Sequence, residues 1–235
     1  SPYLRFGLIS IRDCYRRAWT RTTQESSSSL SATTWVNELI WREFYAYVLF
    51  HFPRTTNEEF QDKYRGTIPW NSREEHFDRF VKAQTGYPIV DAAVKQLLDD
   101  GWMHNRARMI VASFLTKNLL IDWRKGEEFF AQYLMDYELS SNVGGWQWAS
   151  STGTDAQPYF RIFNPYLQGK KFDPDGKYVK KYLPELQNVP ASVIHEPDFH
   201  KHCKNYPRPI VDYKASREMA IEAFKNVGVD SRERR

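Results

Sequence analysis

Cysteine is nearly absent from this chain of 235 residues, which contains only Cys14 and Cys203. Two cysteines so far apart provide neither a disulfide framework nor a metal-ligand spacing, so we expect a reducing compartment and no bound metal. Apolar runs long enough to span a bilayer are also missing, as is a secretory hydrophobic region. The sequence therefore predicts a soluble intracellular protein, cytoplasmic or nuclear, with no membrane partner.

Common catalytic motifs are missing as well. The sequence has no G-x-S-x-G elbow, no P-loop and no G-x-G-x-x-G fingerprint, which argues against the usual nucleophile and nucleotide sites. A net charge of +4 fits a polyanionic partner without requiring one. The 16% of aromatic residues, with 8 Trp, is more informative. Trp is enriched where flat ligands are stacked, although an aromatic helical core would explain most of these residues.

The hydrophobic pattern is helical almost throughout, and strand alternation is nowhere sustained. After a Ser-rich loop at 24–31, Thr34 is expected to cap a helix that stops at Pro53. One all-α domain is expected over residues 1–227, followed by a charged tail at 228–235. The further predicted helices are Ile89–Asp100 (closed by Gly101), Asn105–Asp122, Glu127–Asp136, Lys177–Tyr182 and Tyr213–Val227.

The helix from Thr34 has two faces. A second stripe carries Glu38, Trp41, Arg42 and Tyr45 beside the apolar face. One interpretation is a solvated face with a Glu38–Arg42 ion pair. The other is a wall that binds nucleic-acid bases, in which Trp41 stacks, Glu38 hydrogen-bonds and Arg42 meets phosphate. The expected apolar face consists of Val36, Leu39, Ile40, Phe44, Tyr47 and Val48.

The helix from Asn105 has a similar arrangement. Arg108 lies off its apolar stripe and is expected to cap the helix or to pair with a carboxylate. His104, just before the helix, is interpreted as a hydrogen-bonded loop residue and not as a metal ligand. The expected apolar stripe consists of Ala107, Ile110, Val111, Phe114 and Leu115.

Three segments together resemble a known family. Residues 144–155 combine two Trp with a glycine pair and many small polar residues, which suggests a ligand cavity more than core filling. With residues 35–45 and 101–109, this stretch closely resembles the flavin-binding domain of DNA photolyases and cryptochromes. The resemblance covers nearly the whole chain and implies an all-α, photolyase-type helical FAD-binding domain with a central cavity. The family's N-terminal antenna domain and phosphate-binding segment have no counterpart here, so no antenna pigment is expected on this chain.

The resemblance also implies roles for individual residues near the flavin. Asp136, Glu138 and Asn142 match positions that line the ring, with Asn142 beside N5. Arg108 matches a position near N5 and O4 that is held by Asp136. A polar amide and a cation favour the anionic, reduced form of FAD, which is the active form in this family.

A second set of residues matches positions that contact a cyclobutane pyrimidine dimer flipped out of DNA. In the family, Glu38 and Asn105 hydrogen-bond the bases of the dimer, and burial of Glu38 would favour its protonated form. Trp41 and Trp148 pack against the dimer. The remaining matched positions for substrate or DNA are Arg42, Arg106, Met109, Gln168 and Lys171. Trp70, Trp123 and Trp146 match a path that carries electrons to oxidised flavin.

The implied function is light-driven repair by a deoxyribodipyrimidine photolyase that acts as a monomer on damaged DNA. In that reaction, excited reduced flavin gives one electron to the dimer and recovers it after the ring opens. The run from Asn105 to Met109 resembles the cyclobutane-dimer class, because (6-4) photolyases and animal cryptochromes have a histidine-containing pattern there. Asn142 also favours repair over signalling. The alternatives are a cryptochrome-like photoreceptor that binds FAD without repair, and a nucleic-acid-binding fragment without flavin.

Overall fold

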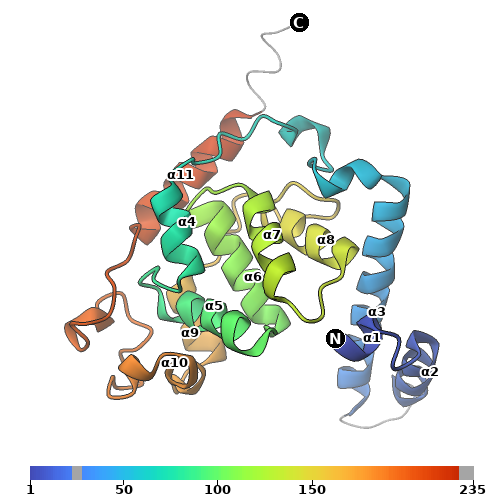
Figure 1. Ribbon diagram of the computed structural model, residues 1–235, viewed down its shortest axis with the longest axis horizontal. Helices are drawn as coiled ribbons and strands as arrows, with labels where there is room; N and C mark the ends of the chain where they lie inside the picture. The colour runs from blue at the N-terminus through green and yellow to red at the C-terminus, as the bar shows by residue number, and fades with distance from the viewer. Residues whose placement is uncertain (23–27, 228–235) are drawn as a thin grey trace, which may run out of the picture.

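The computed structural model describes residues 1–22 and 28–227, and every regular element within these ranges is a helix (Figure 1). The expected all-α fold is therefore confirmed. The α-helices are α1 (Pro2–Arg5), α2 (Ile11–Thr22), α3 (Ser28–His51), α4 (Glu74–Val81), α5 (Pro88–Asp100), α6 (Asn105–Ser113), α7 (Trp123–Tyr133), α8 (Leu139–Ala149), α9 (Pro165–Phe172), α10 (Lys177–Tyr182) and α11 (Tyr213–Asn226). Short 3-10 turns lie at Pro53–Thr56, Asp62–Tyr64, Pro184–Leu186 and Phe199–Lys201.

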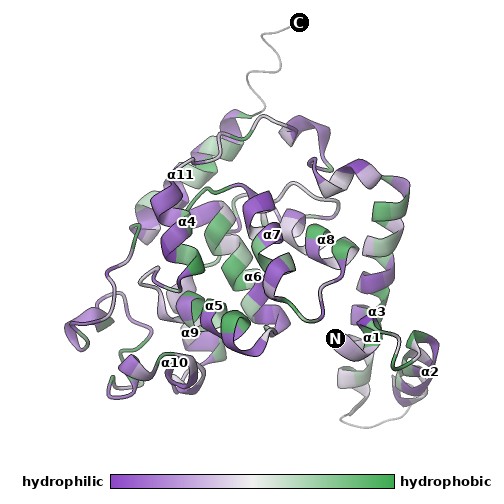
Figure 2. Ribbon diagram, in the orientation of Figure 1, coloured by the Kyte–Doolittle hydropathy of each residue, from purple (hydrophilic) through white to green (hydrophobic). Residues whose placement is uncertain are grey.

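The core is built around α5, which contacts α4, α6, α7, α9 and α10. Val90, Val94 and Leu97 of this helix have no exposed surface. Figure 2 shows hydrophobic segments on α5 and α6 in the middle of the molecule. Pro88 starts the helix, and Gly101 ends it with a left-handed φ of 63° that a side chain would disfavour. The predicted helix Ile89–Asp100 is thus confirmed to within one residue.

The single helix predicted over Asn105–Asp122 is wrong in its second half. After Ser113 the chain widens into a π-helix, Phe114–Asn118, and Leu120 then takes a φ of 52°. Lys117 in this turn is fully buried, and its Nζ donates to Ser150 O at 3.0 Å and to Ser151 Oγ at 2.9 Å. The wider turn brings the lysine to these acceptors, which a helical repeat in the sequence does not reveal. The predicted apolar stripe is nevertheless buried.

Both boundaries of the predicted helix Glu127–Asp136 are also wrong, since α7 runs from Trp123 to Tyr133. Asp122 begins it as an N-cap, with Oδ1 accepting from Arg124 N at 3.0 Å. The next helix, α8, packs closely against α7 at Gly126, where an added Cβ would lie 2.2 Å from the Trp146 ring. This close contact holds α8, which carries the aromatic and glycine-rich segment, in place against α7.

The predicted start of the helix at Thr34 is wrong, because α3 already begins at Ser28. Of the predicted Ser-rich loop, residues 28–31 are helical and 24–27 lie outside the described residues. The predicted end before Pro53 is confirmed. Val36 and Leu39 are buried as expected, but Ile40 is 55% exposed. Tyr47 is 63% exposed, because α1, α2 and α3 stand at one side of the molecule and only part of α3 packs on α8 (Figure 1).

At the other side of the molecule, α10 has the predicted bounds, and α11 ends one residue before the predicted Val227. Asp212 caps α11 by accepting from Ala215 N at 2.8 Å. The predicted charged tail, 228–235, lies outside the described residues. Within residues 1–22 and 28–227, no helix combines the length and apolarity needed to cross a membrane.

Candidate functional site

Helix α8 connects the segments that carry most of the predicted site residues. It contacts α3, which carries Glu38, Trp41 and Arg42, and α6, which begins at Asn105. In Figure 1 it lies between α3 and the α6–α7 pair. Side chains that are distant in the sequence therefore project from helices that share α8 as a neighbour.

Arg108 and Asp136 form the ion pair expected from the sequence. Arg108 Nη2 donates to Asp136 Oδ1 at 3.0 Å and Oδ2 at 3.2 Å, and Arg108 Nε donates to Met103 O at 2.7 Å. Burial alone would raise the pKa of Asp136, but the Ser1 ammonium and the Arg108 guanidinium outweigh it and hold that pKa below its usual value. The guanidinium is thus fixed in direction and keeps its positive charge.

Asn142, in the first half of α8, is held by a carboxylate of α7. Its Nδ2 donates to Glu127 Oε1 at 3.0 Å and to Glu127 O at 3.1 Å. Tyr137 donates its hydroxyl to the same Oε1 at 3.0 Å, and burial followed by the charge of Glu127 raises the pKa of Tyr137 to about 12. With both amide hydrogens directed at Glu127, Asn142 Oδ1 has no donor among the described residues and can accept one from a ligand.

Glu138 acts as the N-cap of α8. Its carboxylate accepts from the backbone N–H groups of Ser140 and Ser141 at 3.1 and 2.9 Å. Both serine hydroxyls donate to Oε2 at 2.7 Å. Burial raises the pKa of Glu138, but these four hydrogen bonds outweigh it and leave that pKa below its usual value. Glu138 therefore remains an anion that stabilises the start of the helix bearing Asn142.

The side chains of α3 are less enclosed than the sequence led us to expect. Glu38 is exposed, so the buried position expected for it is not seen in this structure, and its role stays a prediction. Trp41 is 36% exposed and contacts Phe44 and Tyr45 of its own helix, with ring centroids 5.5 and 5.6 Å away. Arg42 is half-buried and forms no ion pair with Glu38, so the expected pair is wrong, whereas the exposure of Glu38 and Trp41 fits a solvated face.

The glycine pair of α8 has two different environments. A Cβ at Gly144 would lie 2.2 Å from the ring of Tyr45, whereas at Gly145 it would meet nothing within 4 Å. Gly144 is therefore required for packing of α3 against α8, and only Gly145 faces open space. The cavity beside this contact has a volume of about 20 Å³, close to the space that one water needs. The gap between Tyr45 and Gly144 is thus too small for a cofactor.

Two residues predicted to contact DNA meet at one aromatic ring. The Arg106 guanidinium lies 4.7 Å from the ring centroid of Phe172, and Lys171 Nζ lies 5.4 Å from the same centroid. Phe172 is 44% exposed. The start of α6 and the end of α9 therefore form a shared cationic surface, stabilised by cation–π contacts. We call Arg106, Lys171 and Phe172 the basic platform.

The other predicted contact residues lie at the same helices. Asn105 begins α6 and is exposed, while Met109, one turn further on, is half-buried. Gln168 of α9 is half-buried, and its Oε1 has no partner among the described residues. His104 caps α6, with Nδ1 accepting from Arg106 N at 3.1 Å, which confirms its interpretation as a hydrogen-bonded loop residue.

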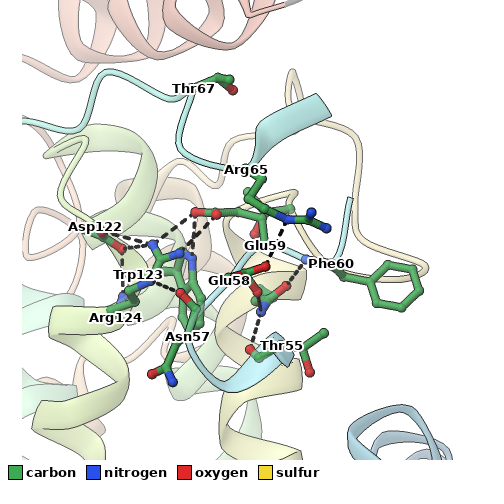
Figure 3. Close-up of polar contacts among 12 residues, drawn as sticks. Thr55, Asn57, Glu58, Glu59, Phe60, Arg65, Thr67, Asp122, Trp123 and Arg124 are labelled. Atoms are coloured by element: carbon green, nitrogen blue, oxygen red, sulfur yellow. Dashed lines mark hydrogen bonds and ion pairs between the residues drawn. The ribbon is translucent and has the colours of Figure 1, made fainter. Parts of the chain in front are cut away.

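Trp123 is anchored by a buried carboxylate (Figure 3). Its Nε1 donates to Glu59 Oε1 at 3.3 Å, and Glu59 is only 1% exposed. Arg124 closes the arrangement by donating to both Glu59 oxygens at 3.0 Å and to Asp122 Oδ1 at 3.0 Å. The buried charge is therefore paired and fully hydrogen-bonded, and it fixes the indole of Trp123.

The other predicted Trp residues contact different neighbours. Trp146 is 2% exposed, packs edge-on against Phe130 at 4.9 Å, and leaves its Nε1 without a partner among the described residues. Trp70 is half-buried and contacts Phe224 of α11 at 6.1 Å. Trp148 is half-buried and packs at the edge of the core. Trp123 and Trp146 are thus buried in the core, whereas Trp70 is half-buried beside α11, and their role as an electron path stays a prediction.

Sequence reasoning missed residues that hold others in place. Gln147, between Trp146 and Trp148, accepts from Phe60 N at 2.9 Å and donates to Thr55 O at 2.8 Å. Glu127, Glu59 and Phe172 were likewise not identified. Their partners are brought together by the fold, so no local pattern marks them. The one available signal was the position of Gln147 between two Trp in the segment that we had singled out.

The described residues thus hold a guanidinium on α6 and an amide on α8 in fixed positions on two helices that pack together. The chain belongs to the family described as the FAD binding domain of DNA photolyase, which matches residues 35–226.

Relatives with curated names agree with this assignment. The chain is 47% identical over 235 aligned residues to a deoxyribodipyrimidine photo-lyase of Alkalihalophilus pseudofirmus. The alignment covers 96% of this chain and 48% of that protein. The chain is 46% identical over 231 residues to the protein of the same name from Escherichia coli, again with 96% and 48% coverage. The chain thus spans about half the length of these relatives.

Solved structures show the same fold. A bacterial class III photolyase from Agrobacterium tumefaciens aligns with a TM-score of 0.87 and 43% identity, over 97% of this chain and 49% of that one. A cryptochrome from Synechocystis aligns with a TM-score of 0.83 and 35% identity, over 95% and 48%. One of these proteins is a photolyase and the other a cryptochrome, the two kinds of protein that the sequence resembles. The expected helical, photolyase-type fold is therefore confirmed.

FAD is the cofactor of this domain, as the family assignment shows. Two features of the chain fit it. Asn142 Oδ1 is available to accept a hydrogen bond, and Arg108 is held as a fixed cation by Asp136. A flavin gains an N–H group and negative charge on reduction, and an acceptor and a cation stabilise that form.

Proposed function

We propose that this domain performs light-driven repair of cyclobutane pyrimidine dimers in DNA. Bound reduced FAD would supply the photoexcited electron that splits the dimer. The observation that carries the proposal is the arrangement of two complementary surfaces around α8: the anchored Arg108 and Asn142 on one hand, and the exposed Glu38 and Trp41 on the other. In this proposal residues 1–227 act as one domain, and a single chain suffices.

The chain's residues would have separate tasks at the flavin. Arg108 would stabilise negative charge on the ring, and Asp136 would keep its guanidinium in place. Asn142 would accept a hydrogen bond through Oδ1, since Glu127 occupies its Nδ2. Glu138 would contribute by fixing the first turn of α8 near the ring. All four are half-buried or buried, which supports a site screened from water.

A second group would bind the damaged strand. Trp41 and Trp148 would pack on the dimer, and Glu38 and Asn105 would hydrogen-bond its bases, with Arg42 and Met109 beside them. Exposure of Glu38 and Trp41 supports this assignment, because a binding face must be open before the ligand arrives. Entry of the flipped dimer would place Glu38 against the bases, where its carboxyl group could hydrogen-bond to them.

The basic platform would hold the DNA backbone. Arg106 and Lys171 present positive charge around Phe172, and Gln168 lies one turn before Lys171 on α9. Contacts to phosphate of this kind position a duplex without reading its sequence. Trp70, Trp123 and Trp146 would carry electrons to oxidised FAD, a step separate from repair.

The test uses oligothymidylate that contains dimers and the chain loaded with chemically reduced FAD. Recovery of thymine absorbance under blue light, and not in darkness, would establish repair. Trp70→Phe is the control: it should abolish photoreduction of oxidised FAD and leave repair by pre-reduced FAD unchanged. Bound FAD without recovery in light would overturn the proposal in favour of a photoreceptor, which the structural similarity to a cryptochrome keeps as the second candidate.

A further inference from the structure

A second, larger cavity lies on the opposite side of the molecule from α1–α3, where α4 and α11 lie (Figure 1). Its volume is about 420 Å³, within the range of small-molecule sites. The walls come from residues 69–76, 118–120 and 211–219. None of the lining residues is one that we assign to FAD, the dimer or the DNA backbone, so the cavity is a separate feature, although Trp70 of the electron path lies between the lining residues Pro69 and Asn71.

The cavity wall contains polar atoms that lack partners. Asn118 is fully buried, and its Nδ2 donates to Ser216 Oγ at 3.0 Å. Among the described residues, nothing donates to Asn118 Oδ1, and His76 Nδ1 is also buried without a partner. An unpaired buried acceptor costs about 1–3 kcal/mol, so a ligand that donates to Asn118 Oδ1 would recover free energy on binding.

Two opposite charges also line the cavity without being paired. Arg73 and Asp212 both contribute to the wall, and neither forms an ion pair with any described residue. Asp212 uses Oδ1 to cap α11, which leaves Oδ2 free. Burial, followed by the nearby Arg73, lowers the pKa of His76, so its imidazole is neutral near pH 7 and adds no charge. The cavity therefore offers one cation for an anionic group and several acceptors for N–H donors.

The remaining wall is apolar and suits a flat ring. Leu119 and Leu120 are buried just after the π-helix, and Met219 of α11, which is 44% exposed, also lines the cavity. Leucine and methionine side chains pack against aromatic heterocycles without directional demands. A molecule that fills this space would thus present an apolar face, an N–H donor and an anionic group at once.

We propose that this cavity binds a nucleoside monophosphate, that is, an amino-bearing heterocycle joined to a phosphate. The phosphate would meet the Arg73 guanidinium, which matches it in a bidentate manner. The exocyclic amino group would donate to Asn118 Oδ1, and the ring would lie against Leu119. The proposal does not depend on repair, because it rests only on the residues of this cavity.

Trp70 provides a local signal for occupancy. Its chain neighbours Pro69 and Asn71 both line the cavity, so binding would alter the surroundings of the Trp70 indole. The test is a titration of AMP into the full chain saturated with FAD, so that the adenosine half of the cofactor does not compete. The measurement is the NMR shift of indole-¹⁵N-labelled Trp, with the Trp70 signal assigned by Trp70→Phe.

The expected result is a saturable shift of the Trp70 signal as AMP is added. The affinity for AMP obtained from it should be at least tenfold weaker in Arg73→Gln and in Asn118→Leu. Lys214→Gln is the matched control, because it removes one positive charge from the first turn of α11 without touching the cavity wall. This variant should bind AMP like the unmodified chain. Arg73 is exposed, so its variant tests the site even if Asn118→Leu fails to fold.

Three results would overturn the proposal. The first is a Trp70 signal that does not move at any AMP concentration. The second is equal affinity for AMP and ribose 5-phosphate, which would make the cavity a plain anion site without recognition of a base. The third is an equal loss of affinity in Arg73→Gln and Lys214→Gln, which would indicate general electrostatic attraction.

Discussion

Asn142 donates both of its amide hydrogens to a single residue, Glu127, at 3.0 Å to Oε1 and 3.1 Å to the backbone oxygen. This contact determines which end of the amide is available to the cofactor. Because Glu127 can only accept, Nδ2 must face it and Oδ1 must face away. The assignment of oxygen and nitrogen in Asn142 thus follows from its partner.

Glu127→Leu is expected to release the Asn142 amide and to weaken its hold on reduced flavin. A loss of about 1.4 kcal/mol in the preference for the two-electron reduced form corresponds to a midpoint potential lower by about 30 mV. Spectroelectrochemical titration of bound FAD measures this shift. Glu128→Leu, at the next and exposed position of α7, is the control and should leave the potential unchanged. Equal potentials in all three proteins would show that Glu127 does not act through Asn142.

Asn142→Asp is expected to place a carboxylate against the carboxylate of Glu127. Repulsion and a negative charge near the ring would both disfavour the anionic reduced flavin. We therefore expect the fully reduced form to be harder to maintain, with a more negative midpoint potential than the unmodified domain. An unaltered midpoint would count against the placement of Asn142 beside the flavin.

Arg108→Met should reduce stability in a pH-dependent manner. The pKa of Asp136 is lower in the folded protein than its value of about 3.9 in an unfolded chain. Its ion pairs therefore stabilise the fold fully above about pH 4, and this stabilisation is lost as the pH falls through the lower, folded pKa. The variant should lose about 1.5–3 kcal/mol in the free energy of unfolding at pH 7.

Urea unfolding of the Arg108→Met variant between pH 2 and pH 7 provides the check. The difference from the unmodified chain should shrink as the pH falls towards 2, because Asp136 then takes up a proton and loses its ion pair. Arg106→Met is the control, because it also removes one guanidinium, which lies over the ring of Phe172. Its effect on the free energy of unfolding should not depend on pH in this range. A constant difference for Arg108→Met would contradict the role of Asp136.

The Gly144 and Gly145 pair offers a comparison of neighbouring positions. Gly144→Ala would force Tyr45 away from α8, and overpacking of this kind costs about 1–3 kcal/mol. Gly145→Ala meets open space inside a helix, where Ala is favoured over Gly by about 0.5–1 kcal/mol. Thermal unfolding should therefore move in opposite directions for the two variants. A shift of the same sign and size in both would show that Tyr45 does not pack on Gly144.

The success of the sequence-based predictions depended on the range of the interactions. Helix α5 was predicted to within one residue, because Pro88, its apolar residues and Gly101 all act locally. The π-helix was not predicted, since Lys117 is drawn inward by Ser150 and Ser151, more than thirty residues later. The apolar face of α3 was overestimated, because periodicity identifies Tyr47 as apolar-facing but does not show whether anything covers it.

The same limit explains the outcome for the candidate site. The Arg108–Asp136 pair was expected from the resemblance, and the structure contains it. Glu59 and Trp123 are 64 positions apart, and no local pattern connects an acid in one loop to an indole at the start of a helix. The glycine pair was interpreted as part of a cavity, yet Gly144 is small because Tyr45 packs on it. Packing between distant segments was thus beyond the sequence patterns.

The measurement that tests the central claim most directly is the repair yield per absorbed photon. It is determined side by side for the unmodified chain, Glu38→Ala and Glu43→Ala, all loaded with chemically reduced FAD. Glu38 and Glu43 are both exposed acids on α3, and only Glu38 is assigned to the dimer. The account predicts light-dependent recovery of thymine absorbance in the unmodified chain and in Glu43→Ala, and a lower yield in Glu38→Ala with unchanged flavin absorption. No recovery from the unmodified chain with FAD bound, or equal yields in all three, would contradict it.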